Sequence, residues 1–137
     1  MKDPIYPLQM SAGFNIDMGF ELIEWSQDLA VSRVILQDKH LNSQGIVHGG
    51  VYCAFLDFTS GMCGVYGEPT DPMRTCVTLS LTTNFLSPAR QGMLIGRARR
   101  TGGGRSIFFA EGSIEDSDGN ILATSTGTFK YNTKKSK

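Results

Sequence analysis

Residues 45–67 read GIVHGGVYCAFLDFTSGMCGVYG, and this stretch decides the fold. From Val51 onward its only charged residue is Asp57, and apolar side chains fall on every side of a helical wheel. A helix that is apolar all round has to be buried, and the length of the stretch favours a helix over a strand. The sequence therefore predicts one central, buried helix from about Gly49 to about Gly64.

Strand-like segments lie on both sides of this helix. Two precede it and four follow it, and an Asp-Gly turn joins the last two. In the third strand Val77, Leu79 and Leu81 alternate with hydroxyl residues, which predicts a half-buried strand with those three on one face. Two strands, one buried helix and a meander of four strands predict an α+β fold in which the sheet curls around the helix and a partner subunit closes its open side. The predicted strands are 21–27, 29–36, 76–85, 93–101, 106–115 and 121–131.

The composition narrows the class of protein. The chain has 137 residues with 13 Lys and Arg against 13 Asp and Glu, so its charge gives no reason to expect binding to nucleic acid or to an anionic membrane. Its apolar runs are too short for a membrane span, and residues 1–10 lack the apolar region typical of a secretory leader, so we expect neither feature. Three cysteines without a CxxC pair match neither a disulfide framework nor a Cys-rich zinc site, so we expect a cytoplasmic protein without a metal. We expect one domain over 1–137, with its core at about 18–131 and a flexible basic tail at 132–137.

Asp57 is the residue in the helix that needs an explanation, because an unpaired buried carboxylate costs several kcal/mol. Its neighbours one helical turn away are all small, so it would look out over a shallow surface; they are Cys53, Ala54, Ser60 and Gly61. Two interpretations remain open. Backbone N–H groups satisfy the carboxylate and it fixes the docking of the helix, or it belongs to a functional site.

His48, Gly49 and Gly50 stand where the predicted helix begins. The free N–H groups at a helix N-terminus polarise oxygen atoms, and glycines let a ligand carbonyl approach the backbone closely. Together these properties suit an oxyanion hole. An ordinary glycine-rich loop is the alternative.

The pattern NSQGIVHGG at 42–50, followed after six residues by Asp57, resembles the signature of the hotdog-fold acyl-CoA thioesterases, PaaI-like (phenylacetate-degradation) branch. The similarity covers roughly residues 18–131. This resemblance implies a hotdog fold, which is a curved antiparallel sheet wrapped around one long helix. It also implies homodimers that pair into homotetramers, active sites at the subunit interface, and hydrolysis of an acyl-CoA without any cofactor beyond the substrate's own coenzyme A. Further segments that carry the resemblance are NFLSPA at 84–89, GRS at 104–106 and DGNILA at 118–123.

The resemblance also implies roles for individual residues. Asp57 would be the nucleophile or the general base, and the Gly49 N–H would be the oxyanion donor. Asn42 would orient the thioester or a water, His48 would hold the loop by a hydrogen bond, and Thr78 would place a hydroxyl near the carboxylate.

A second group of residues would bind the substrate. Gly50 would keep the approach to the helix N-terminus open. The phosphates of coenzyme A would lie near Arg90 and Arg105, since Arg suits phosphate binding, with Gly104 and Ser106 beside the second arginine. The remaining arginines of the strand at 93–101 are expected on a solvated face.

The spacing of Gly49 and Asp57 supports a site between subunits. Eight residues correspond to about 12 Å along a helix, too far for one thioester group to contact both residues easily in one chain. Two antiparallel helices related by a two-fold axis would bring Gly49 of one chain near Asp57 of the other.

Two other functions remain open on the same fold. A hydratase or dehydratase would need a His working with an acid or Asn in the pocket, whereas here His48 sits at the Gly-Gly step and Asp57 occupies the helix position. A non-catalytic acyl-CoA-binding protein would keep the pocket and lose the carboxylate, which Asp57 argues against. The sequence leaves open whether the acyl group is aromatic or aliphatic.

Overall fold

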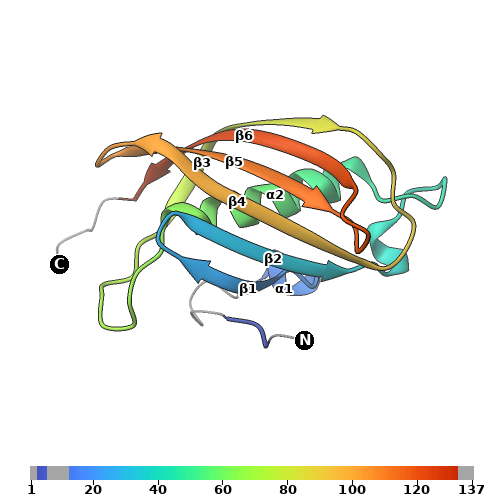
Figure 1. Cartoon of the computed structure of the whole chain (residues 1–137), viewed down its shortest axis with the longest axis horizontal. Helices are drawn as coiled ribbons and strands as arrows, with labels where there is room; N and C mark the ends of the chain where they lie inside the picture. The colour runs from blue at the N-terminus through green and yellow to red at the C-terminus, as the bar shows by residue number, and fades with distance from the viewer. Residues whose placement is uncertain (1–2, 6–12, 133–137) are drawn as a thin grey trace.

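The computed structural model describes residues 3–5 and 13–132, so residues 133–137 of the tail predicted at 132–137 lie outside the described residues. One helix packs against a six-stranded antiparallel sheet that curves around it (Figure 1). Within the described ranges, no helix has the length and apolar character needed to cross a membrane. In chain order the elements are α1 (Phe14–Asp17), β1 (Glu21–Ser26), β2 (Leu29–Ile35), the short 3-10 helix η2 (Asp38–His40), α2 (Gly49–Gly64), β3 (Cys76–Phe85), β4 (Met93–Gly103), β5 (Ile107–Glu115) and β6 (Ile121–Tyr131).

The helix α2 has the bounds that the apolar stretch predicts. Phe55 and Leu56 are fully buried against the sheet, and Trp25 of β1 donates its indole N–H to the Met62 carbonyl oxygen at 2.8 Å. The core is therefore the layer between α2 and the concave face of the sheet. This architecture confirms the predicted hotdog fold.

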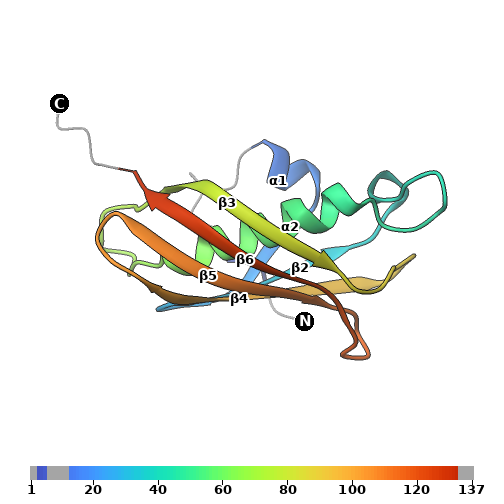
Figure 2. The ribbon, with the colours of Figure 1, turned by 90° about the horizontal axis from the view of Figure 1, so that it is seen from above.

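The predicted four-strand meander is wrong for β3. The strand order is β1-β2-β4-β5-β6-β3, so only β4, β5 and β6 form a meander, and β3 pairs with β6 at the edge (Figure 2). The loop that follows β3 explains this order. It starts beside β6, where Leu86 N–H donates to Leu122 O, and ends beside β2, where Leu36 N–H donates to Gly92 O. It is a crossing loop, where the sequence suggested a simple turn.

The side-chain alternation predicted for β3 is also wrong. The register with β6 shifts between Thr78 and Ser80, so Leu79 bulges out without a partner. Thr78 and Leu81 consequently share the side that faces the helix, because the residues opposite them on β6 are buried. Val77 and Leu79 are 47% and 53% exposed, so the strand is not half-buried within this chain.

The end of α2 is packed closely enough to predict a stability effect. A Cβ added at Gly64 would lie 2.2 Å from the ring of Phe108, which is fully buried and stacked on Phe129 at 5.0 Å. We therefore expect Gly64→Ala to lower the free energy of unfolding by about 2 kcal/mol, as overpacking of a rigid core does. Urea unfolding measures this value. Gly104→Ala is the matched control, since a Cβ there meets nothing within 4 Å. Equal stabilities of the two variants would contradict the prediction.

Candidate active site

Asp57 and Thr78 meet between α2 and β3. The Thr78 Oγ1 hydroxyl donates a hydrogen bond to Asp57 Oδ1 at 2.6 Å. Asp57 is half-buried and has this hydroxyl as its partner, so the cost of an unpaired buried carboxylate does not arise. The reason is the position of β3, which supplies a hydroxyl from the edge of the sheet and leaves this side of the helix open. The structure thus brings together two of the residues that the resemblance singled out.

Small residues continue along the open side of α2. Gly50, Ala54, Asp57 and Gly61 follow one another at helical spacing, and each is exposed or half-buried. Ser60 departs from the expectation, because it is fully buried against the sheet. The carboxylate therefore lies on a shallow surface bordered by β3, as three of its four small neighbours predict.

Cys76, the first residue of β3, has a thiol whose ionisation is affected by this carboxylate. Burial and then the charge of Asp57 raise the pKa of the Cys76 thiol to about 11. A thiol with this pKa remains protonated at neutral pH, and thiolate is the nucleophilic form. The Cys76 thiol is therefore a poorer nucleophile at neutral pH than the Asp57 carboxylate beside it.

The N-terminus of α2 is organised by His48. The Nδ1 atom of its ring accepts a hydrogen bond from the Gly50 N–H at 2.8 Å. The backbone N–H of His48 donates to the backbone carbonyl oxygen of His40 at 2.9 Å. A Cβ at Gly50 would lie 2.9 Å from His48 Nδ1, so the cap requires a glycine at that position. The Gly50 N–H is thus occupied, whereas the Gly49 N–H meets no acceptor among residues 3–5 and 13–132. The ring of Phe85 lies against Gly49: a Cβ added at Gly49 would be 3.4 Å from Phe85 Cε1.

Asn42 and Arg90 both hold the loop that precedes α2. Asn42 Oδ1 accepts the N–H groups of Gln44 at 2.9 Å and Ile46 at 3.4 Å. Arg90 Nη1 donates to the carbonyl oxygens of Gln44 at 3.2 Å and Gly45 at 3.4 Å. These contacts fix the loop conformation that presents the helix N-terminus.

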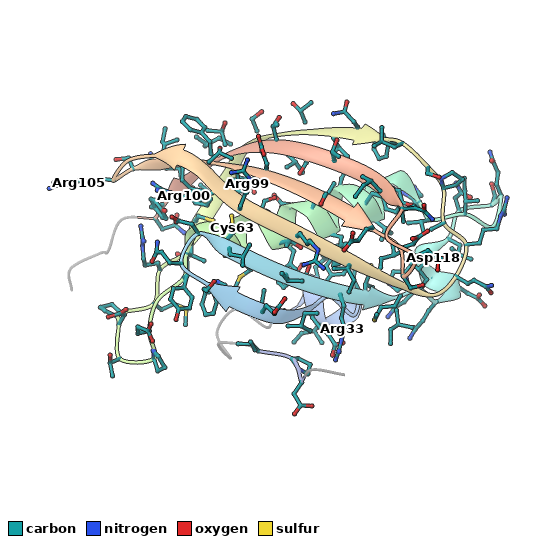
Figure 3. All side chains as sticks on the ribbon, viewed as in Figure 1. Arg33, Cys63, Arg99, Arg100, Arg105 and Asp118 are labelled. Atoms are coloured by element: carbon teal, nitrogen blue, oxygen red, sulfur yellow. The ribbon has the colours of Figure 1, made fainter. Side chains whose placement is uncertain are left out.

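A single chain does not bring Arg90 and Arg105 together. Arg105 lies in the turn between β4 and β5, at the end of the molecule where α2 ends; the opposite end carries Asp118 (Figure 3). Arg90 lies beside the loop where α2 begins. The 16 residues of α2 separate these ends by about 22 Å. Gly104 and Ser106 lie with Arg105, so the predicted substrate residues form two separate groups within one chain.

The sequence was also compared with models of known protein families. A family model described as the thioesterase superfamily matches residues 44–123, from the loop before α2 to the beginning of β6. The chain belongs to the thioesterase superfamily.

Relatives of this thioesterase-superfamily chain carry names of the same kind. A Mycobacterium tuberculosis protein named as an esterase is 29% identical over 122 residues, which cover 85% of this chain and 84% of the relative. A Saccharolobus solfataricus protein named as an esterase is 31% identical over 113 residues, 82% of this chain and 73% of the relative. A solved structure from Ralstonia eutropha, named as a thioesterase related to phenylacetic acid degradation, is 29% identical with a TM-score of 0.74 and covers 92% of this chain and 91% of its own. These names indicate a hydrolase.

The site of this superfamily member offers a carboxylate, a hydroxyl and a helix N-terminus. In the described part of the chain, no three His, Cys, Asp or Glu side chains group as metal ligands would. Two neighbours were missed at the level of sequence, Phe85 over Gly49 and Cys76 beside Asp57. Both side chains lie on the face of β3 that points toward the helix. The bulge at Leu79 determines which residues of β3 lie on this face, and the alternating sequence pattern does not indicate a bulge.

Proposed function

We propose that this protein is an acyl-CoA thioesterase, which hydrolyses the thioester of an acyl- or arylacyl-coenzyme A to the free acid and coenzyme A. The observation that carries the proposal is the Asp57 carboxylate, held by Thr78 on the uncovered side of α2. Membership of the thioesterase superfamily supports the same reaction.

We propose further that the working unit is a homodimer. Among the described residues, the ten-residue strand β3 pairs with β6 alone and carries exposed apolar side chains, an arrangement that favours pairing of its free edge with a second chain. If two copies pair through β3 about a two-fold axis, their α2 helices lie antiparallel on the same side of the joined sheet. Gly49 of one subunit then faces Asp57 of the other. The pairing of two such dimers into a homotetramer stays a prediction.

In this dimer the thioester carbonyl oxygen accepts the Gly49 N–H of one subunit. As the tetrahedral intermediate forms, this oxygen gains charge, and the N–H and the helix dipole stabilise the charge more than they stabilise the neutral carbonyl. Asp57 of the other subunit either attacks the carbonyl carbon, giving an anhydride that water then hydrolyses, or takes a proton from the attacking water. In both routes the C–S bond breaks and coenzyme A leaves as a thiolate. A thiolate is a good leaving group, so no general acid has to protonate the sulfur as it departs.

Thr78 has a positioning role in this mechanism, because its hydroxyl fixes one oxygen of the carboxylate. We expect Thr78→Val to lower kcat about tenfold, the effect of losing a hydrogen bond worth about 1.4 kcal/mol, with a smaller change in KM. Thr78→Ser keeps the hydroxyl and should retain most of the activity. Steady-state kinetics of the two variants measures the difference, and an unchanged kcat for Thr78→Val would contradict the role.

The proposed function is tested by following thiol release from a panel of aromatic and aliphatic acyl-CoA esters with the purified protein. We expect turnover of at least one ester, and the panel will identify the acyl group. Binding of these esters without turnover would indicate a non-catalytic acyl-CoA-binding protein. Hydration of an enoyl-CoA without thiol release would indicate a hydratase.

A further inference from the structure

Arg74 lies on the loop just before β3 and is held there by an aromatic ring. Its guanidinium carbon is 4.0 Å from the centroid of the Tyr131 ring. Tyr131 is itself fixed, because it is buried and its hydroxyl donates to Gly64 O at 2.7 Å. Stacking uses the face of the guanidinium and leaves the N–H groups at its edge available for a ligand.

Arg74 and Arg105 differ from the other arginines of the described chain. Neither has a carboxylate or carbonyl acceptor among residues 3–5 and 13–132, and both are exposed. Their N–H groups are therefore open to an external anion. The other arginines are engaged as follows: Arg33 with Glu21, Arg97 with Glu115 and Arg99 with Glu111, each at 2.9 Å, and Arg90 and Arg100 with backbone carbonyl oxygens.

The two open arginines lie at the same end of the molecule. The Tyr131 N–H donates to Ser106 O at 2.8 Å, so the residue that supports Arg74 is tied to the neighbour of Arg105. Figure 3 shows Arg105 and Arg100 at this end and Asp118 at the other. Positive charge therefore gathers where α2 ends.

The acidic residues of the Arg74 loop are engaged with their own loop. Glu68 Oε1 accepts the Tyr66 hydroxyl at 2.9 Å, and Asp71 Oδ2 accepts the Glu68 N–H at 2.8 Å. Both carboxylates are exposed and neither forms an ion pair with Arg74. Their charges are therefore screened by solvent, and they leave the guanidinium free.

We propose that Arg74 binds a phosphate group of coenzyme A, on the same end of the chain as Arg105. The proposal rests on the proposed function and adds a residue to its substrate site. Coenzyme A carries three phosphates, and the planar guanidinium fork matches a phosphate group. Arg90 lies at the opposite end of its own chain, so Arg74 is the arginine that the described residues of the same chain offer near Arg105 without a carboxylate or carbonyl acceptor.

The position of Arg74 also relates this phosphate contact to the reacting carboxylate. Two residues further along the chain, the Cys76 thiol lies 3.8 Å from Gly61 O, and Gly61 is one helical turn beyond Asp57. The charges of Arg74 and Asp57 both act on the Cys76 thiol. A substrate that extends from Asp57 along the open side of α2 would therefore reach Arg74 before it leaves the surface.

The test compares two thioesters with the same acyl group. One is the acyl-CoA, and the other is the N-acetylcysteamine thioester, which has the reacting group but no phosphate. We expect Arg74→Gln to lower kcat/KM for the acyl-CoA about tenfold or more, mainly through KM, and to leave kcat/KM for the truncated thioester unchanged. Arg74→Lys should recover part of the loss, since it keeps the charge without the fork. Arg97→Gln, which removes an ion-paired arginine from the outer face of the sheet, is the control and should change neither value.

Equal losses on both thioesters, or no loss on either, would overturn the proposal. Calorimetric titration with coenzyme A separates this failure from a failure of the proposed function, because it needs no turnover. If the wild-type protein hydrolyses neither thioester but Arg74→Gln weakens coenzyme A binding about tenfold, the phosphate contact stands and the reaction is wrong. If the two proteins bind coenzyme A equally, the phosphate contact is wrong. Where the contact is supported, titration with 3′-dephospho-coenzyme A identifies the phosphate. If Arg74→Gln no longer weakens binding of this ligand, Arg74 binds the 3′-phosphate; if it still does, Arg74 binds the pyrophosphate.

Discussion

Asp57→Asn is expected to lower kcat for an acyl-CoA at least about a hundredfold, the lower range for loss of a general base. Asparagine keeps the shape of the side chain and still accepts the Thr78 hydrogen bond, so the packing of α2 against β3 is retained. The amide lacks the charge and basicity needed to attack the thioester or to take a proton from water. Single-turnover and steady-state kinetics with the best ester of the panel measure the loss.

The variant should fold, form the same oligomer and bind acyl-CoA as the wild type does. Asp118→Asn, a change to an exposed carboxylate in the turn between β5 and β6, is the matched control and should keep full activity. Near-normal kcat for Asp57→Asn would remove the residue from the mechanism. It would then be a structural residue that docks the helix on the edge strand.

The second large effect is expected from Leu79→Asp. Leu79 bulges from β3 without a partner on β6 and is 53% exposed, so the isolated fold should lose little stability. In the proposed dimer the change places two carboxylates at the paired edges, where burial of unpaired charge is costly. We expect a monomer by light scattering, with native circular dichroism and at least about a hundredfold lower kcat/KM, because Gly49 and Asp57 no longer meet.

Ile35→Asp is the control for this experiment. Ile35 is similarly exposed, at 51%, but it is the last residue of β2. In the strand order β2 lies next to the edge opposite to β3. This variant should keep both the oligomer and the activity. A fully active Leu79→Asp monomer would contradict the shared site.

The elements themselves were predictable because their signals are local. The helix from Gly49 to Gly64 follows from an apolar stretch bounded by glycines, and the strands follow from alternation between turn residues. The pairing of Asp57 with Thr78 was predictable from family resemblance only, since 21 residues separate them along the chain.

The parts that were missed depend on long-range pairing. The position of β3 beside β6 follows from a loop that crosses the sheet, and nothing within residues 76–85 reports it. The separation of Arg90 from Arg105 has the same origin, because it depends on which end of the helix each loop reaches. Arg74 had no motif around it, and its stacking on Tyr131 joins segments 57 residues apart.

Because Leu79 bulges out of β3, a residue can be removed at that position without changing how the rest of β3 pairs with β6. Thr78 and Ser80 face consecutive residues of β6, so a chain without residue 79 would keep Thr78 turned toward Asp57 and Phe85 turned toward Gly49. Loss of one residue between positions 81 and 84 would instead turn Phe85 to the outer face. Evolutionary insertions and deletions in this strand should therefore be confined to the bulge, where a change of length is neutral for the site.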